Sequence, residues 1–165
     1  MDEVQQSVNY ENEIAGLESK IESSAKWFYW VAGLSVVNTL IIFFGGEVSF
    51  IVGLGITQLI DGFVYEASET AKFVVLFINI LISGMFAIFG YFALKQEKWA
   101  FIVGMVLYFL DGLIFLLVDD WLSIAFHAYV LFSLFGGIKS LNKIDSIKTS
   151  VDGGLHRIEK EISKL

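Results

Sequence analysis

The sequence predicts an all-α membrane protein: a polytopic bundle of about five apolar helices between two amphipathic tails. Hydrophobic residues make up 56% of the 165 residues and charged residues only 18%, whereas soluble domains average about 45–50% and about 25%. The charges are also concentrated at the ends, because residues 1–26 and 139–165 hold 18 of the 29. The section between them is too apolar for a soluble core.

Polar or glycine-rich breaks divide this section into five apolar segments. We expect helices over about 27–44, 48–65, 72–94, 99–118 and 121–138. At a rise of about 1.5 Å per residue, segments of this length match the hydrocarbon core of a bilayer. The predicted domains are an N-terminal acidic amphipathic helix over 1–26, a transmembrane helix bundle over 27–138 and a C-terminal helix over 139–165. We expect the first apolar segment to be a retained anchor because an acidic stretch precedes it.

Both tails carry apolar residues at the 3–4 spacing of a heptad repeat. The N-terminal series is Tyr10, Ile14, Leu17 and Ile21. The C-terminal series is Leu141, Ile144, Val151, Leu155, Ile158, Ile162 and Leu165, with Lys148 as the one exception. Such stripes need a partner helix or a membrane surface. We therefore expect a coiled coil, within the chain or between copies, or else a helix that lies on headgroups. The pair Gly153-Gly154 predicts a hinge in the C-terminal helix.

Loop charges predict the orientation, because lysine and arginine in short loops mark the cytoplasmic side. Lys95 and Lys98 lie between the third and fourth segments, and Lys139 and Lys143 follow the fifth. We expect both regions to be cytoplasmic, in a plasma membrane or a bacterial inner membrane, with the C-terminus inside.

Two topologies satisfy this orientation. If all five segments cross, the N-terminus is outside, which segment length favours. If the second segment only dips into the membrane, both tails are cytoplasmic and every lysine and arginine except Lys72 is inside. Loop charge favours this second arrangement, in which the N-terminal tail of net charge −4 can meet the C-terminal tail of +2.

Polar side chains within the apolar segments are costly in lipid, so each requires a structural or functional reason. They are Asn38, Gln58, Asp61, Asn79, Asp111 and His127. We interpret the amides as interhelical hydrogen-bonding groups and expect Asp61 to reach the membrane interface. The same segments contain glycines that we expect to mark close helix packing: Gly33, Gly53, Gly55, Gly84, Gly90 and Gly104.

Asp111 and His127 are predicted to contact each other. They lie about eight residues before and about seven residues after the acidic turn at Asp119-Asp120. In two antiparallel helices joined there, both side chains reach nearly the same depth. The pair is either a structural clamp or a proton-handling site.

Composition argues against most enzymatic functions. The chain has no cysteine and only two histidines, which excludes thiolate and histidine-built metal sites. It has no nucleophile elbow, zinc-protease or phosphate-loop motif and no basic patch for nucleic acid. We expect no catalytic activity, cofactor or metal. The first hypothesis is a membrane module that oligomerises or docks a partner through its tails. The alternative is an ion or proton pathway through Asp111, His127, Asp61, Gln58 and Asn38.

Overall fold

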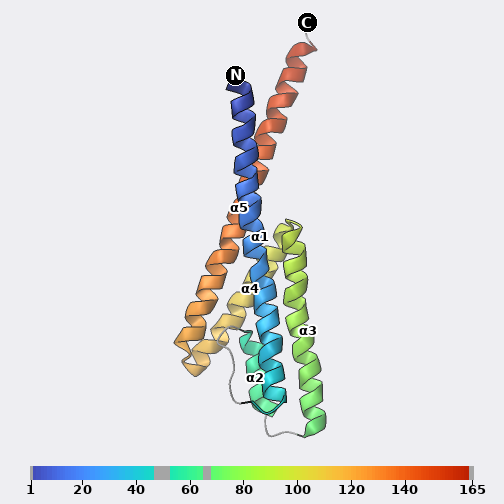
Figure 1. The fold of residues 1–165 in the computed structure, drawn as a ribbon, viewed down its shortest axis with the longest axis vertical. Helices are drawn as coiled ribbons and strands as arrows, with labels where there is room; N and C mark the ends of the chain where they lie inside the picture. The colour runs from blue at the N-terminus through green and yellow to red at the C-terminus, as the bar shows by residue number, and fades with distance from the viewer. Residues whose placement is uncertain (1, 47–52, 65–67, 164–165) are drawn as a thin grey trace.

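The computed structural model describes residues 2–46, 53–64 and 68–163 (Figure 1). These residues form α1 (Asp2–Phe43), α2 (Gly55–Val64), α3 (Glu69–Leu94), α4 (Lys98–Ile114), the 3-10 helix η1 (Phe115–Val118) and α5 (Trp121–Ile162). The described ranges contain no strand, as the predicted all-α class requires.

Four helical stretches within these ranges are long and apolar enough to cross a membrane: Asn9–Phe43, Glu69–Leu94, Lys98–Val118 and Trp121–Gly154. The chain is therefore a multi-pass membrane protein. The second predicted segment, 48–65, is not among them, and its residues 48–52 and 65 lie outside the described ranges. Its helix α2 has ten residues, roughly 15 Å, which is half of a hydrocarbon core of about 30 Å.

The tails do not form separate helices, because α1 and α5 each continue for 42 residues through tail and span. α5 has no break at the predicted boundary between 138 and 139, or at the preceding pair Gly136-Gly137. A Cβ at Gly137 would lie 2.8 Å from the Phe101 ring, so this glycine allows α4 and α5 to pack closely. The hinge predicted at Gly153-Gly154 is also wrong, since α5 stays helical through both residues.

An aromatic cluster fills the bundle where α1, α3 and α4 meet. The ring of Phe28 lies 6.0–6.5 Å, between centroids, from the rings of Phe86, Phe89 and Phe101. All four side chains are buried. A Cβ at Gly104 would lie 2.5 Å from the Phe28 ring, so the absence of a side chain there makes room for the ring.

The glycine prediction is correct for Gly53, Gly55, Gly90 and Gly104, where an added Cβ would lie within 3 Å of another side chain. It is wrong for Gly33 and Gly84, because no neighbouring atom lies within 4 Å of an added Cβ there. These two glycines are not packing contacts.

The start of α1 and the end of α5 project beyond the turn between α3 and α4, on the side of the molecule that we call the tail end (Figure 1). The opposite end holds the end of α1 and the start of α3 (Figure 1). At the tail end Lys143 of α5 pairs with Glu13 of α1, and Lys98 of α4 pairs with Asp145 of α5, both at 2.5 Å. The acidic and basic tails therefore meet within one chain.

Candidate functional site

The N-terminus of α2 lies inside the bundle, and side chains from two other helices satisfy its backbone. The first N–H groups of a helix have no partner within it. Here the amide of Leu54 donates to Ser35 Oγ of α1 at 2.7 Å. The amides of Gly55 and Ile56 donate to the two carboxylate oxygens of Asp111 of α4, at 2.8 and 2.9 Å. A carboxylate at this position also interacts favourably with the positive end of the helix dipole.

The predicted contact between Asp111 and His127 is confirmed. Nε2 of His127 lies 3.1 Å from Oδ2 of Asp111, and both residues are buried. Nδ1 of His127 lies 2.9 Å from the carbonyl oxygen of Ser123, which can only accept a hydrogen bond. An ionised Asp111 can also only accept, so this arrangement requires a hydrogen on both ring nitrogens, or one on the carboxyl group. The pair is therefore a buried polar contact between α4 and α5.

Aromatic rings and glycines enclose this pair. The ring of Tyr108 stacks on the imidazole of His127, with 4.3 Å between centroids and 14° between planes. Phe115 lies 5.0 Å from the same imidazole. A Cβ at Gly112 would lie 3.1 Å from His127, and one at Gly55 would lie 2.8 Å from Phe115. Small residues are therefore necessary for this close approach of α2, α4 and α5.

A second polar cluster fixes the other half of α2. The carboxylate of Asp61 accepts hydrogen bonds from Thr39 Oγ1 of α1 at 3.0 Å and from Asn79 Nδ2 of α3 at 2.8 Å. Asp61 is 4% exposed, and its hydrogen-bond partners come from two other helices. That Asp61 lies near the membrane interface stays a prediction. The interhelical role predicted for Asn79 is confirmed.

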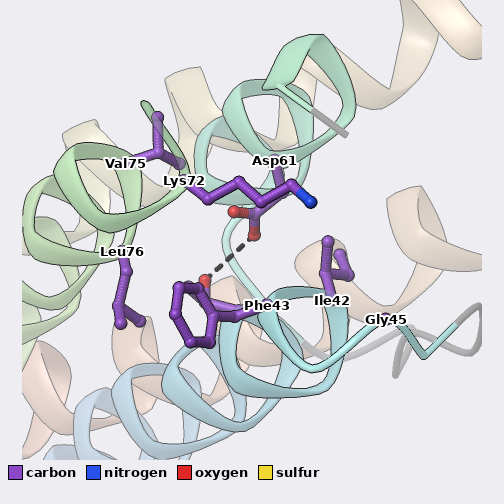
Figure 2. A pocket seen from close by; sticks show the side chains of 8 residues that line it. Ile42, Phe43, Gly45, Asp61, Lys72, Val75 and Leu76 are labelled. Atoms are coloured by element: carbon purple, nitrogen blue, oxygen red, sulfur yellow. Dashed lines mark hydrogen bonds between the residues drawn. The ribbon is translucent and has the colours of Figure 1, made fainter. Parts of the chain in front are cut away.

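A pocket of about 240 Å³ adjoins Asp61 at the end of the bundle opposite the tails (Figure 2). Its lining comes from α1, α2, α3 and the turn after α1: Thr39, Ile42, Phe43, Gly45, Asp61, Lys72, Val75 and Leu76. One acidic and one basic side chain thus share a mainly apolar cavity.

The remaining predicted polar residues lie near the start of α2. Asn38 is fully buried, and a Cβ at Gly53 would lie 2.7 Å from its Nδ2. Gln58 is partly buried, and its Nε2 atom has no hydrogen-bond partner in the described part of the chain.

The predicted tail residues divide into two groups. In α1, Ile14 and Leu17 are half-buried and Ile21 is buried. In α5, Leu141 and Ile144 are buried, whereas Val151 is 49% and Ile162 64% exposed. The side chains of Leu155, Ile158 and Leu165 lie outside the described residues.

Four residues of these clusters and the pocket are not among the predicted site residues: Ser35, Thr39, Tyr108 and Lys72. Hydroxyl side chains are tolerated in transmembrane helices, so Ser35 and Thr39 gave no signal of their own. Their spacing of four residues, with Asn38 between them, places all three near one another on α1, and this spacing was the available clue.

Comparison of the chain with protein-family models, curated proteins and solved structures gives no match.

Proposed function

We propose that this protein is a non-catalytic membrane module that docks a second copy of itself, or a partner helix, through its tail helices. The observation that carries the proposal is the apolar stripe of α5. Leu141 and Ile144 belong to the buried core, whereas Val151 and Ile162 continue the same heptad series and are exposed. An apolar stripe of this kind is stabilised when a second helix covers it.

The length of α5 supports the same proposal. Its 42 residues extend roughly 63 Å, about twice the hydrocarbon thickness, so much of the helix lies in water. Toward their ends α1 and α5 diverge, so α1 leaves this part of α5 uncovered (Figure 1). An ion pair between Lys143 and Glu13 joins α5 to α1.

The proposed topology has four crossings, with α2 as a re-entrant helix and both tails in the cytoplasm. Apart from Lys72, every lysine and arginine lies in the first 26 residues, beside the α3–α4 turn, or at residue 139 and beyond. This distribution fits the positive-inside rule when the tail end is cytoplasmic. The membrane is then a plasma membrane or a bacterial inner membrane.

The docking proposal is tested with Val151→Asp and Ile162→Asp in one chain. The matched control is Thr149→Asp with Ser150→Asp, two exposed polar positions on the same helix. Native mass measurements in mild detergent should show oligomer or co-purified partner for wild type and control. The Val151/Ile162 variant should insert normally but lose that species. A wild-type monomer without partner, or an unchanged variant, contradicts the proposal.

A second candidate function is an ion or proton pathway. Helices that end inside a membrane protein commonly face permeant ions or substrates, and α2 begins beside the Asp111–His127 pair. Buried polar atoms without a protein partner in the described residues include Tyr108 Oη, Ser83 Oγ, Gln58 Nε2 and Asn79 Oδ1. Ordered water inside the bundle would satisfy them.

Proton flux into vesicles that contain a pH-sensitive dye tests this candidate. A pathway through the pair predicts flux for wild type and its loss in Asp111→Asn with assembly unchanged. Absence of flux from wild-type vesicles, or equal flux in the variant, rules out a pathway through this pair.

A further inference from the structure

We infer that the pocket beside Asp61 binds a phosphoethanolamine group, with its primary ammonium on Asp61 and its phosphate on Lys72. Such a site is separate from the docking role, because it lies at the end of the bundle opposite the tails (Figure 1).

The first support is the carboxylate of Asp61, which forms no ion pair within 4.0 Å with a described residue. Its hydrogen-bond donors, Thr39 and Asn79, are both neutral, and no ion pair to Asp61 occurs among the described residues. Buried charges in membrane proteins are paired, protonated or used for function. A carboxylate offers about four acceptor positions, so two bonds leave capacity for an ammonium group from the pocket side.

The second support is Lys72, which lines the same pocket. Its Nζ lies 3.1 Å from Glu69 Oε1, but the Glu69 side chain is 78% exposed, and exposed pairs of this kind contribute little. The ammonium of Lys72 is therefore available to an anion. Lysine binds phosphate as a point charge without requiring a fixed geometry.

The arrangement of the lining residues matches a ligand with a zwitterionic headgroup and an apolar chain. In the view of Figure 2, Asp61 and Lys72 lie on one side of the pocket, and Ile42, Phe43 and Leu76 lie around the rest. The volume, about 240 Å³, is below the roughly 300–1,000 Å³ of pockets for drug-sized ligands. It suits a headgroup and not a whole lipid.

The depth of the pocket fits the same ligand. Asp61 lies three residues before the end of α2, and Lys72 is the fourth residue of α3. Both helix ends face the membrane surface opposite the tails in the four-crossing topology. The ligand is therefore a phosphatidylethanolamine headgroup or the free headgroup, which share the same recognised chemistry.

Lipids that differ only in the number of methyl groups on the amine test the contact with Asp61 most directly. A primary ammonium can donate three hydrogen bonds, whereas the trimethylammonium of phosphatidylcholine can donate none. Loss of a charge-assisted hydrogen bond to a buried carboxylate corresponds to about a tenfold change in affinity or more. We expect wild type to prefer phosphatidylethanolamine over phosphatidylcholine by at least that factor, with the monomethyl lipid between them.

The experiment is native mass spectrometry of the purified full-length protein with short-chain phosphatidylethanolamine, its monomethyl form and phosphatidylcholine. Lys72→Gln should weaken all three lipids, and its partly exposed position keeps the fold intact. Asp61→Asn should remove the preference for the primary amine. Lys95→Gln, at the tail end, is the matched control and should behave as wild type.

Competition with free phosphoethanolamine distinguishes a lipid headgroup from the soluble headgroup as the ligand. Displacement of the lipid at comparable concentration assigns the site to the soluble headgroup, and a lipid preference without displacement assigns it to the membrane lipid. Equal retention of the three lipids by wild type overturns the inference. Unchanged binding in Lys72→Gln overturns it as well, whether or not Asp61→Asn folds.

Discussion

Asp111 links three parts of the bundle: α4, which carries it, and α2 and α5, which its carboxylate contacts. It accepts two backbone hydrogen bonds from the start of α2 and lies 3.1 Å from His127 of α5. Its own backbone belongs to α4. Removing the charge therefore affects three helices together, and the consequence is measurable as a change in stability.

We predict that Asp111→Asn lowers the free energy of unfolding by about 3–5 kcal/mol, the usual effect of breaking a buried ion pair. An amide cannot accept from both backbone N–H groups and also from His127. His127→Gln should cost a similar amount, and the double variant should cost less than the sum, because the two residues share one interaction. Denaturant titration in micelles measures all three variants. Asp152→Asn, an exposed position on α5, is the control, and strictly additive costs would contradict the pairing.

Asp120 gives a second prediction, outside the membrane spans. Its carboxylate accepts hydrogen bonds from the Ser123 hydroxyl at 2.6 Å and the Ser123 amide at 3.1 Å, which cap the start of α5. These bonds hold the pKa of Asp120 below its ordinary value of 3.8. A lowered folded-state pKa stabilises the fold above about pH 3.8, and this contribution is lost as the pH falls through the folded-state value.

Asp120→Ala should therefore reduce stability by roughly 1 kcal/mol at pH 7, the typical cost of a lost helix cap. The difference from wild type should shrink when unfolding is measured below pH 4. Asp119→Asn is the control, since asparagine tolerates the positive φ of 53° found there. A difference that stays constant from pH 7 to pH 3 would refute the charged cap.

At the residue scale, depth along two antiparallel helices was sufficient to predict the contact between Asp111 and His127. It was not sufficient to predict what else the carboxylate binds. The backbone amides of Gly55 and Ile56 are present in any sequence, so no residue type marks them as partners. The position of Asp61 near the end of its segment predicts a place at the membrane interface but not its partners, because Thr39 and Asn79 lie in distant segments.

At the element scale, α2 depends on its neighbours more than the long helices do. Ten residues form too short a helix to be stable alone. Ser35, Thr39, Asn79 and Asp111 supply bonds to its start or to Asp61, and all of them come from other helices. Its position therefore depends on how closely these neighbours approach.

Two glycines of α2 test this dependence. A Cβ at Gly55 would lie 2.8 Å from the Phe115 ring and 3.2 Å from the Asp111 carbonyl oxygen, whereas nothing lies within 4 Å of one at Gly62. Gly55→Ala should push α2 away from Asp111 and lower stability by about 1–3 kcal/mol, as overpacked sites do. Gly62→Ala should be neutral or stabilising by up to about 1 kcal/mol. Thermal unfolding of both variants measures the difference, and equal effects would contradict the close contact.

The helical period and the apolar runs were sufficient to predict four long helices. The second run was harder to interpret, because its length of 18 residues favours a crossing whereas the loop charges favour a re-entrant segment. The start of α2 lies inside the bundle because Ser35 and Asp111 accept hydrogen bonds from its backbone amides. These hydrogen-bond acceptors belong to other segments, so the composition of 48–65 alone could not identify the shorter helix. The tail boundaries failed for a related reason: Gly137 packs against Phe101 and does not end its helix.

At the scale of the whole molecule, the tail end gathers opposite charges and the longest helices. The pairs Glu13–Lys143 and Lys98–Asp145 link α1, α4 and α5 there, while Lys72 is the only basic residue at the opposite end of the described chain. This asymmetry supports the proposed topology of four crossings with α2 as a re-entrant helix.

Single-cysteine accessibility tests this topology most directly, because the chain has no native cysteine. Ser7→Cys and Ser163→Cys represent the two tails, and Thr70→Cys and Asp119→Cys represent the opposite end. With an impermeant thiol reagent on intact cells, four crossings predict protection at both tail positions and labelling at Thr70 and Asp119. Labelling at Ser7 with protection at Ser163 would contradict the account, because the second segment would then cross the membrane.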